Sequence, residues 1–198
     1  DLRDLHRTSS EADGLRQHDL MASALDALEA LPVPVIAAIE GATRGGGCEV
    51  LLACDMRVAA EDVTLGFAQI HMAVTPGWGG ARRLLERVGY AHAFELLLTG
   101  GMLSARKAYA IGLVNHITPR GRALTEARRI ALQFANGPQG ALRGVKEGLR
   151  AHLRLPPEAA RAREREIFAQ LWASPDHAEA VLAFLERREP VFSKEAGR

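Results

Sequence analysis

The stretch that decides the fold runs from Gly41 to Asp55 and reads G-A-T-R-G-G-G-C-E-V-L-L-A-C-D. An apolar run, Val33 to Ile39, precedes it, and an apolar segment with a single acid, Glu49, follows its three consecutive glycines. That order predicts a buried strand, a glycine turn and a helix. Glycine lets a backbone pass close to a ligand, and the first N–H groups of a helix have no partner inside it. Gly46 is therefore a candidate to donate its amide to a negative oxygen, as in an oxyanion hole.

Glu49 is the candidate reactive group of the same helix. It lies about one turn from the helix start, at ~1.5 Å of rise per residue, and its neighbours are apolar. Carboxylates are rarely buried without a reason. Glu49 therefore either pairs with a buried cation or borders a cavity, and we expect the cavity. The structural alternative is that the glycines only mark tight packing or a helix cap.

The rest of the chain alternates strands with helices and then becomes helical. Apolar residues recur at helical spacing from Leu15 to Leu31, after a polar loop over residues 6–14, and Pro32 ends this helix. Residues 69–76 are expected to form a loop or a strand end. Further strands are expected over residues 56–60, 63–67 and 113–117, and helices over 80–87, 90–98, 104–112, 122–135, 139–153, 157–172 and 175–188. This order indicates an α/β core with a C-terminal helical lobe.

The composition is that of a well-cored globular protein. The chain has 198 residues, of which 47% are hydrophobic and 25% charged, and its net charge of +1 argues against a general nucleic-acid binder. No run approaches the ~18 apolar residues of a membrane span. Cys48 and Cys54 lie on one expected helix and are read as reduced, which favours a cytoplasmic protein. No Cys/His grouping has the spacing of metal ligands, so no metal is expected.

These residues resemble the signature of the enoyl-CoA hydratase/isomerase (crotonase) superfamily. The resemblance spans nearly the whole chain, and its segments are Ile36 to Gly41, Gly45 to Gly47, Leu52 to Met56, Leu65 to Leu84, Leu96 to Ile117 and Phe184 to Phe192. It implies an α/β fold in which a spiral of ββα units carries a C-terminal helical oligomerisation lobe. We expect the spiral core over residues 1–135 and a trimerisation region over 136–198. The implied assembly is a homotrimer or a dimer of trimers.

The resemblance also implies an acyl-CoA thioester as the substrate. Gly46 matches the second donor of the family's oxyanion hole, and Glu49 matches the first of the two glutamates that hydratases use. The first oxyanion-hole donor is expected just before Asp1, so the chain is expected to be incomplete. Coenzyme A enters only as part of the substrate, and no separate cofactor is expected.

Gln69 is where the sequence departs from the family pattern. Aligning Gly66-Phe-Ala-Gln-Ile70 with G-x-P-E-[IVL] places this glutamine at the position of the second acid. An amide can hold a water or an acyl group but cannot exchange a proton usefully near neutral pH. His71, two residues on, would share a face with Gln69 in an extended segment and could supply an acid; the alternative is a hydrogen-bonded loop histidine.

Three functions remain open at the level of the sequence. The first is an enoyl-CoA hydratase, a lyase, in which Gln69 orients the acyl group. The second is a decarboxylase of the ethylmalonyl- or methylmalonyl-CoA type, which the segment from Phe67 to Gly80 also resembles and whose chemistry needs no carboxylate at position 69. The third is a family member that binds acyl-CoA with little or no turnover. Trp78 is expected as a core residue or a wall of the acyl pocket.

Two arginines are candidates for binding the coenzyme A portion of the substrate. Arg3 stands where relatives often place a basic residue near the phosphates. Arg187, in the C-terminal F-L-E-R-R, resembles a position that reaches the nucleotide of a neighbouring subunit. For both, the alternative is an exposed surface charge.

Overall fold

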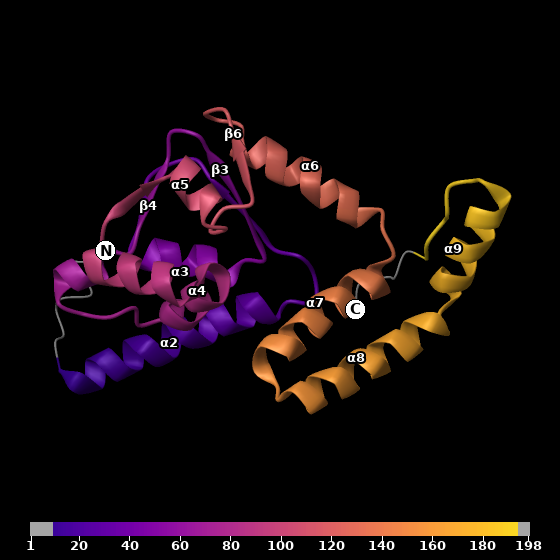
Figure 1. The fold of residues 1–198 in the computed structure, drawn as a ribbon, viewed down its shortest axis with the longest axis horizontal. Coiled ribbons are helices and arrows are strands. Elements are labelled where there is room, and N and C mark those ends of the chain that lie inside the picture. Colours follow the sequence, from indigo (N-terminus) through magenta and orange to yellow (C-terminus); the bar gives the residue numbers. More distant parts are fainter. Residues whose placement is uncertain (1–9, 194–198) are drawn as a thin grey trace. The chain divides into compact units, whose positions relative to one another are not determined.

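The computed structural model describes residues 10–193 (Figure 1). The described chain divides into two compact units: one comprises residues 10–31 together with Val35–Ala127, and the other comprises Pro32–Pro34 and residues 128–193. Residues 36–118 of the first unit alternate strands and helices, as the sequence predicts. The second unit is helical.

Two three-stranded sheets organise the first unit. In one sheet β1 (Ile36–Ile39), β3 (Met56–Ala60) and β6 (His116–Thr118) run parallel in the order β1-β3-β6. In the other, β4 (Thr64–Gly66) lies between β2 (Thr43–Arg44), to which it is parallel, and β5 (Met102–Ser104), to which it is antiparallel.

The first two turns of the chain each give one strand to each sheet and then form a helix. The strands β1 and β2 are followed by α3 (Gly46–Ala53), and β3 and β4 are followed by α4 (Gly80–Thr99). These are the ββα units that the resemblance implied. Figure 1 shows α2, α3 and α4 next to one another on one side of the strands.

The core of this unit lies around β3 and α3. β3 is buried from Arg57 to Ala60, as expected for a strand covered on both faces. The buried apolar cluster consists of Ile39, Cys48, Leu52, Ala59, Ala60, Val63, Leu65, Phe67, Leu84, Ala93, Leu96, Leu103, Ala105, Ala108, Leu113 and Val114. α3 contributes Cys48 and Leu52 to this cluster, so its orientation is fixed by packing.

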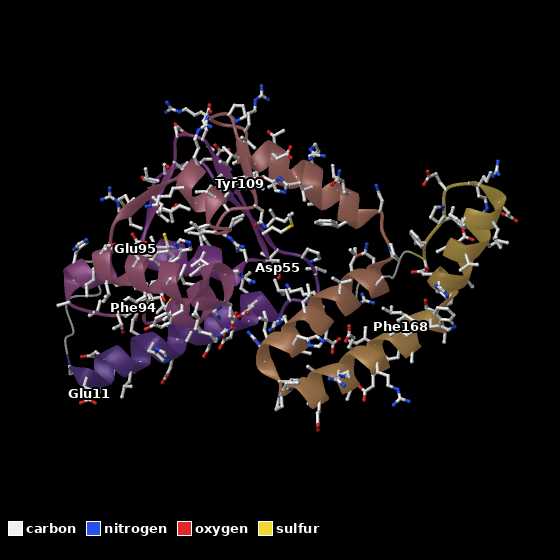
Figure 2. The ribbon with its side chains drawn as sticks, in the orientation of Figure 1. Glu11, Asp55, Phe94, Glu95, Tyr109 and Phe168 are labelled. Atoms are coloured by element: carbon white, nitrogen blue, oxygen red, sulfur yellow. The ribbon has the colours of Figure 1, made fainter. Side chains whose placement is uncertain are left out.

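Hydrogen bonds fix both ends of the β1-to-β3 segment. Asp55, which follows α3 and is labelled in Figure 2, accepts a hydrogen bond from the Val35 amide at 2.7 Å. The buried Arg57 side chain donates to the carbonyl oxygens of Cys54 at 2.9 Å and Leu113 at 2.6 Å. Burial lowers the pKa of Arg57 to about 10. The carbonyl end of α3 is thereby tied to β3 and to the turn between α5 (Ala105–Ala110) and β6.

The helix α2 (Glu11–Ala30) begins four residues before the expected Leu15. Ser10 and Asp13 form a capping box, in which the Ser10 side chain accepts from the Asp13 amide and Asp13 accepts from the Ser10 amide. The prediction of a loop over residues 6–14 is therefore wrong for residues 11–14. The polar residues there cap a helix.

Two further segments test the expected elements. Residues 80–87 and 90–98 were expected as separate helices, and α4 is indeed broken at Gly89, which has φ 74° and ψ 170°. Residues 69–76 were expected as a loop or strand end, but Ala68–Met72 form a short 3₁₀ helix, η1. This second difference matters for the site.

The second unit consists mainly of α7 (Gln139–Arg154), α8 (Pro157–Trp172) and α9 (Pro175–Glu186), and α6 (Ala123–Ala135) crosses the boundary between the units. α7 and α8 pack closely because Gly144 has no side chain: a Cβ there would lie 2.8 Å from Ile167 Cγ2. Ser174 caps α9 by accepting from the His177 amide at 3.2 Å. No helix of residues 10–193 is both long and apolar enough to cross a membrane.

Candidate active site

The glycine turn before α3 has the backbone shape that the sequence predicted. Gly45 has φ 54° and ψ −121°, a conformation that side chains disfavour, and its amide donates to the Gly66 carbonyl oxygen at 2.9 Å. This bond joins the ends of β2 and β4. It places the start of α3 beside the segment that leads into Gln69.

The Gly46 amide is free to bind a ligand. The amides of Cys48 and Glu49 both donate to the Gly45 carbonyl oxygen, at 2.9 and 3.3 Å. Within residues 10–193, no acceptor takes a hydrogen bond from the amide of Gly46 or Gly47. Two N–H groups therefore remain available at the positive end of α3.

Glu49 is buried, with 2% of its surface exposed, and its carboxylate is held by three N–H donors. Oε1 accepts from the backbone amides of Trp78 at 2.9 Å and Gly80 at 3.0 Å. Oε2 accepts from Gln69 Nε2 at 3.1 Å. No arginine, lysine or histidine of the described residues forms an ion pair with Glu49, so the alternative of a buried cation does not hold there.

Gly80 is required for this arrangement. A Cβ at Gly80 would lie 2.5 Å from Glu49 Oε1, well inside van der Waals contact. Only glycine lets the backbone amide approach the carboxylate this closely. Gly80 also begins α4, where an amide has no partner inside the helix.

Gln69 lies beside Glu49, as the family alignment implied. Its Nε2 is engaged with the carboxylate, whereas its Oε1 is buried and accepts no hydrogen bond within the described part of the chain. A buried unpaired amide oxygen is costly, so it is a natural acceptor for a water or a ligand donor. Glu49 Oε2 and Gln69 Oε1 thus offer two acceptors at one place.

Trp78 contacts both Gly46 and Glu49. Its indole ring lies against the Cα of Gly46, in the space that a Cβ at Gly46 would need. Its backbone amide holds Glu49. The half-buried ring therefore forms a wall beside the proposed oxyanion donor.

His71 is not placed as the sequence analysis supposed. It lies on η1, which is a 3₁₀ helix with three residues per turn, so residues two apart do not share a face. Its side chain is exposed, and the ring lies near Gly100, where a Cβ would be 2.5 Å from His71 Nε2. The premise of an extended segment is wrong. The structure brings Gln69, and not His71, to Glu49.

Of the two arginines that are candidates for binding coenzyme A, the structure describes only one. Arg3 lies outside the described residues. Arg187 ends α9 in the left-handed conformation, with φ 56°, and its side chain is exposed. Its role stays a prediction.

Cys48, next to Glu49, is a structural residue. Burial raises the pKa of its thiol to about 11, and its single S–H proton is shared between the carbonyl oxygens of Thr43 at 3.2 Å and Gly66 at 3.3 Å. A neutral, hydrogen-bonded thiol is a poor nucleophile. Over residues 10–193, no group of three or more His, Cys, Asp or Glu side chains is placed to hold a metal ion.

The role of the Trp78 and Gly80 amides is not predicted from the sequence. Pro76 to Gly80 reads P-G-W-G-G and leads into the helix expected over residues 80–87, and the start of a helix has free N–H groups. Which acid they would bind could not be inferred, because Glu49 lies 29 and 31 residues earlier in the chain.

Comparison with known proteins identifies the family. The enoyl-CoA hydratase/isomerase family model matches residues 1–195. A probable enoyl-CoA hydratase of Mycobacterium bovis is 36% identical over 166 residues, which cover 84% of this chain and 65% of that protein. The 2,3-dehydroadipyl-CoA hydratase of Escherichia coli is 36% identical over 165 residues, covering 83% of this chain and 65% of that one.

Solved structures agree. An enoyl-CoA hydratase from Bacillus anthracis has a TM-score of 0.88 at 33% identity, covering 94% of this chain and 72% of that one. One from Geobacillus kaustophilus has a TM-score of 0.92 at 30% identity, covering 98% of this chain and 73% of that one. The chain belongs to the enoyl-CoA hydratase/isomerase family and has the α/β crotonase fold, with ββα units and C-terminal helices. It spans about 65% of the length of these two curated relatives.

Proposed function

We propose that this protein acts on an acyl-CoA thioester and that its reaction is the hydration of an enoyl-CoA. The observation that supports this most directly is the pairing of a free Gly46 amide with a buried, hydrogen-bonded Glu49 carboxylate one turn further along α3. The two curated relatives described above are named as hydratases, which supports the same reaction.

In this proposal the Gly46 amide binds the thioester carbonyl oxygen. Charge then moves from the α-carbon into that oxygen, and the enolate is stabilised by a donor that is already in place. Removing one such donor typically costs about 10²–10³ in rate. The Trp78 ring, lying against Gly46, would keep water away from the oxygen.

Glu49 would activate the water. Its Oε1 is occupied by two backbone amides, so Oε2 is the oxygen with room for a further donor. A water that donates to Glu49 Oε2 and to Gln69 Oε1 would be held by both acceptors. Glu49 takes one proton as the water oxygen bonds to the β-carbon, and the same carboxyl returns that proton to the α-carbon. The sum is the addition of one water, and Gln69 never exchanges a proton.

The coenzyme A portion is proposed to contact Arg3 and Arg187 through its phosphates, and coenzyme A is present only as part of the substrate. Arginine suits this task because its planar guanidinium binds phosphate oxygens in pairs. For Arg187 the support is its exposed position at the end of α9.

Residues 136–198 are proposed to assemble the protein as a homotrimer or a dimer of trimers. The support is a set of exposed apolar side chains on α7, α8 and α9, among them Leu149 at 64%, Phe168 at 62% and Phe184 at 82% exposed; Phe168 is labelled in Figure 2. The proposed location is the cytoplasm, supported by the two buried cysteines, which form no disulfide in the described part of the chain. Light scattering of the purified protein tests the assembly.

A second function is favoured by one specific observation, the glutamine beside Glu49. Loss of CO₂ from a malonyl-type acyl-CoA needs the oxyanion donor to receive the enolate, and it does not need a second carboxylate, which would repel the departing group. Assays with crotonyl-CoA and ethylmalonyl-CoA separate the two reactions. We expect hydration of crotonyl-CoA, and CO₂ release without hydration would replace the first proposal by the second. Binding of both without turnover would support a binding protein.

A further inference from the structure

A fully buried arginine braces the loop that holds Glu49. Arg83, on the first turn of α4, has 0% of its surface exposed. Its Nε donates to Glu29 Oε2 at 2.9 Å and its Nη2 to Asp26 Oδ1 at 2.6 Å. Both acids lie on α2. The third nitrogen, Nη1, donates to the Trp78 carbonyl oxygen at 2.8 Å.

The peptide groups around Trp78 are thus held from two sides. The Trp78 carbonyl accepts from Arg83, while the Trp78 and Gly80 amides donate to Glu49 Oε1. Gly79 lies between them with φ 82°, and a Cβ there would lie 2.8 Å from Arg83 Nη1. The guanidinium therefore sits against the backbone of the same three residues that orient the catalytic candidate.

We propose that Arg83, held by Asp26 and Glu29, is a positioning residue that sets the orientation of the Glu49 carboxylate through the Trp78–Gly80 loop. The expected effect on kcat rests on the function proposed above, whereas the expected effect on the hydrogen bonds of Glu49 does not. The orientation of Glu49 matters because Oε1 and Oε2 have different tasks. Two amides must stay on Oε1 for Oε2 to face the water.

The geometry is specific to arginine. A guanidinium donates in three fixed, coplanar directions, which here reach two acids and one carbonyl. A lysine keeps the charge, but its three N–H donors share one nitrogen on a flexible stem, so it cannot reach acceptors that bind three different nitrogens of Arg83. Arg83→Lys therefore separates the geometry of the brace from its charge.

Arg82 provides the matched control. It is the neighbouring residue on α4, it also pairs with Glu29 at 3.0 Å, and its side chain is 41% exposed. It also pairs with Glu86 at 2.7 Å, but no hydrogen bond joins its side chain to the Trp78 carbonyl in the described chain. Arg82→Lys thus perturbs the same acid without touching the loop.

The experiment compares the wild type, Arg83→Lys, Arg82→Lys, Glu49→Gln and the double variant Arg83→Lys/Glu49→Gln. The first measurement is the amide proton chemical shifts of Trp78 and Gly80 by NMR, with crystal structures of the same variants. In Arg83→Lys both amide protons are expected to move upfield, in the direction of Glu49→Gln, as their bonds to the carboxylate lengthen. Arg82→Lys is expected to leave them unchanged.

The second measurement is steady-state hydration of crotonyl-CoA. Arg83→Lys is expected to lower kcat by about 10- to 100-fold, as for a misplaced catalytic group, with little change in KM. Arg82→Lys should stay within about twofold, because the Arg82 side chain is 41% exposed and makes no bond to the loop. Adding Arg83→Lys to Glu49→Gln should cost nothing further, since the brace acts through Glu49.

Two results would overturn the proposal: Trp78 and Gly80 amides that still bind Glu49 in Arg83→Lys, or an Arg83→Lys penalty that is equally large in the Glu49→Gln background. If the wild type shows no hydration, the proposed function fails, but the amide shifts still decide whether Arg83 positions Glu49. If Arg83→Lys does not fold, Gly79→Ala displaces the loop without removing a buried charge, and the same two amide shifts are expected to move. Unchanged shifts in that variant would reject the brace.

Discussion

The indole ring of Trp78 lies against the Cα of Gly46, in the space that a side chain at Gly46 would fill. The amide of the same tryptophan donates to Glu49 at 2.9 Å. The proposed oxyanion donor and the proposed base are thus coupled through one residue of another ββα unit. A substitution at Gly46 is therefore expected to shift the hydrogen bond between Trp78 and Glu49, and a substitution at Glu49 is expected to shift the Trp78 ring at Gly46.

Gly46→Ala tests the oxyanion end of this relationship. The new methyl group would overlap the Trp78 ring, so either the ring or the start of α3 must shift. We expect kcat/KM for crotonyl-CoA to fall about 100-fold, the cost of losing an oxyanion donor. Gly41→Ala is the control, because a Cβ at Gly41 meets nothing within 4 Å and its φ is not positive. Equal activity of the two variants would contradict the assignment of Gly46.

Glu49→Gln tests the base. The new amide oxygen can still accept from the Trp78 and Gly80 amides, and Gln69 can rotate its own amide to accept from the new NH₂ group. We therefore expect a folded protein that binds crotonyl-CoA with nearly unchanged affinity. Its kcat should be lower than that of the wild type by a factor of about 10²–10⁴. Calorimetry and steady-state kinetics measure the two quantities. A variant with wild-type kcat would remove Glu49 from the mechanism.

Gln69→Glu restores the second carboxyl of the family pattern. Because Gln69 Nε2 lies 3.1 Å from Glu49 Oε2, the new carboxyl and Glu49 cannot both be ionised easily, and one of the pair will have a raised pKa. The pH profile of kcat should change from a single acidic limb to a bell, with hydration at least as fast as in the wild type. Gln69→Met, which has a similar shape and no titrating group, should keep the single limb. A bell-shaped profile already present in the wild type would show that another group supplies the acid.

The buried Cys48 thiol predicts a loss of stability at alkaline pH. Its pKa is raised from 9.0 to about 11 by burial, so the folded protein holds the proton more tightly than the unfolded chain does. This contribution is fully present below pH 9 and is lost as the pH rises towards 11. It amounts to roughly 2–3 kcal/mol of unfolding free energy. Urea denaturation between pH 8 and 11 measures it, and Cys48→Ala should show a smaller fall over that range than the wild type, whereas an equal fall would assign the effect to other groups.

The part of the fold that sequence predicts well is the part set by local pattern. Val33 to Ile39 contains β1, the three glycines open α3, and the helix expected over 157–172 has the observed bounds of α8. Each of these rests on hydrophobic spacing or on glycine and proline. The neighbourhood of Glu49 and Gln69 followed from the family alignment, and the structure brings the two side chains to 3.1 Å.

What the sequence could not give depends on contacts between distant residues. The amides that hold Glu49, and the brace from Glu29 to Arg83, join residues between 29 and 54 positions apart. No local sequence pattern predicts the 3₁₀ helix around His71. Because this segment is not extended, His71 does not share a face with Gln69. The polar residues Ser10 and Asp13 favoured a loop in the sequence, but in the structure they cap α2.

The central claim is that the Gly46 amide binds the thioester oxygen while Glu49 Oε2 faces the β-carbon. A crystal structure of the protein with butyryl-CoA, a saturated thioester that cannot be hydrated, tests it most directly. We predict that the thioester oxygen lies about 2.7–3.1 Å from the Gly46 nitrogen, with Glu49 Oε2 and Gln69 Oε1 on the side of the β-carbon. A thioester oxygen bound elsewhere, with the Gly46 amide making no contact to the ligand, would contradict the account.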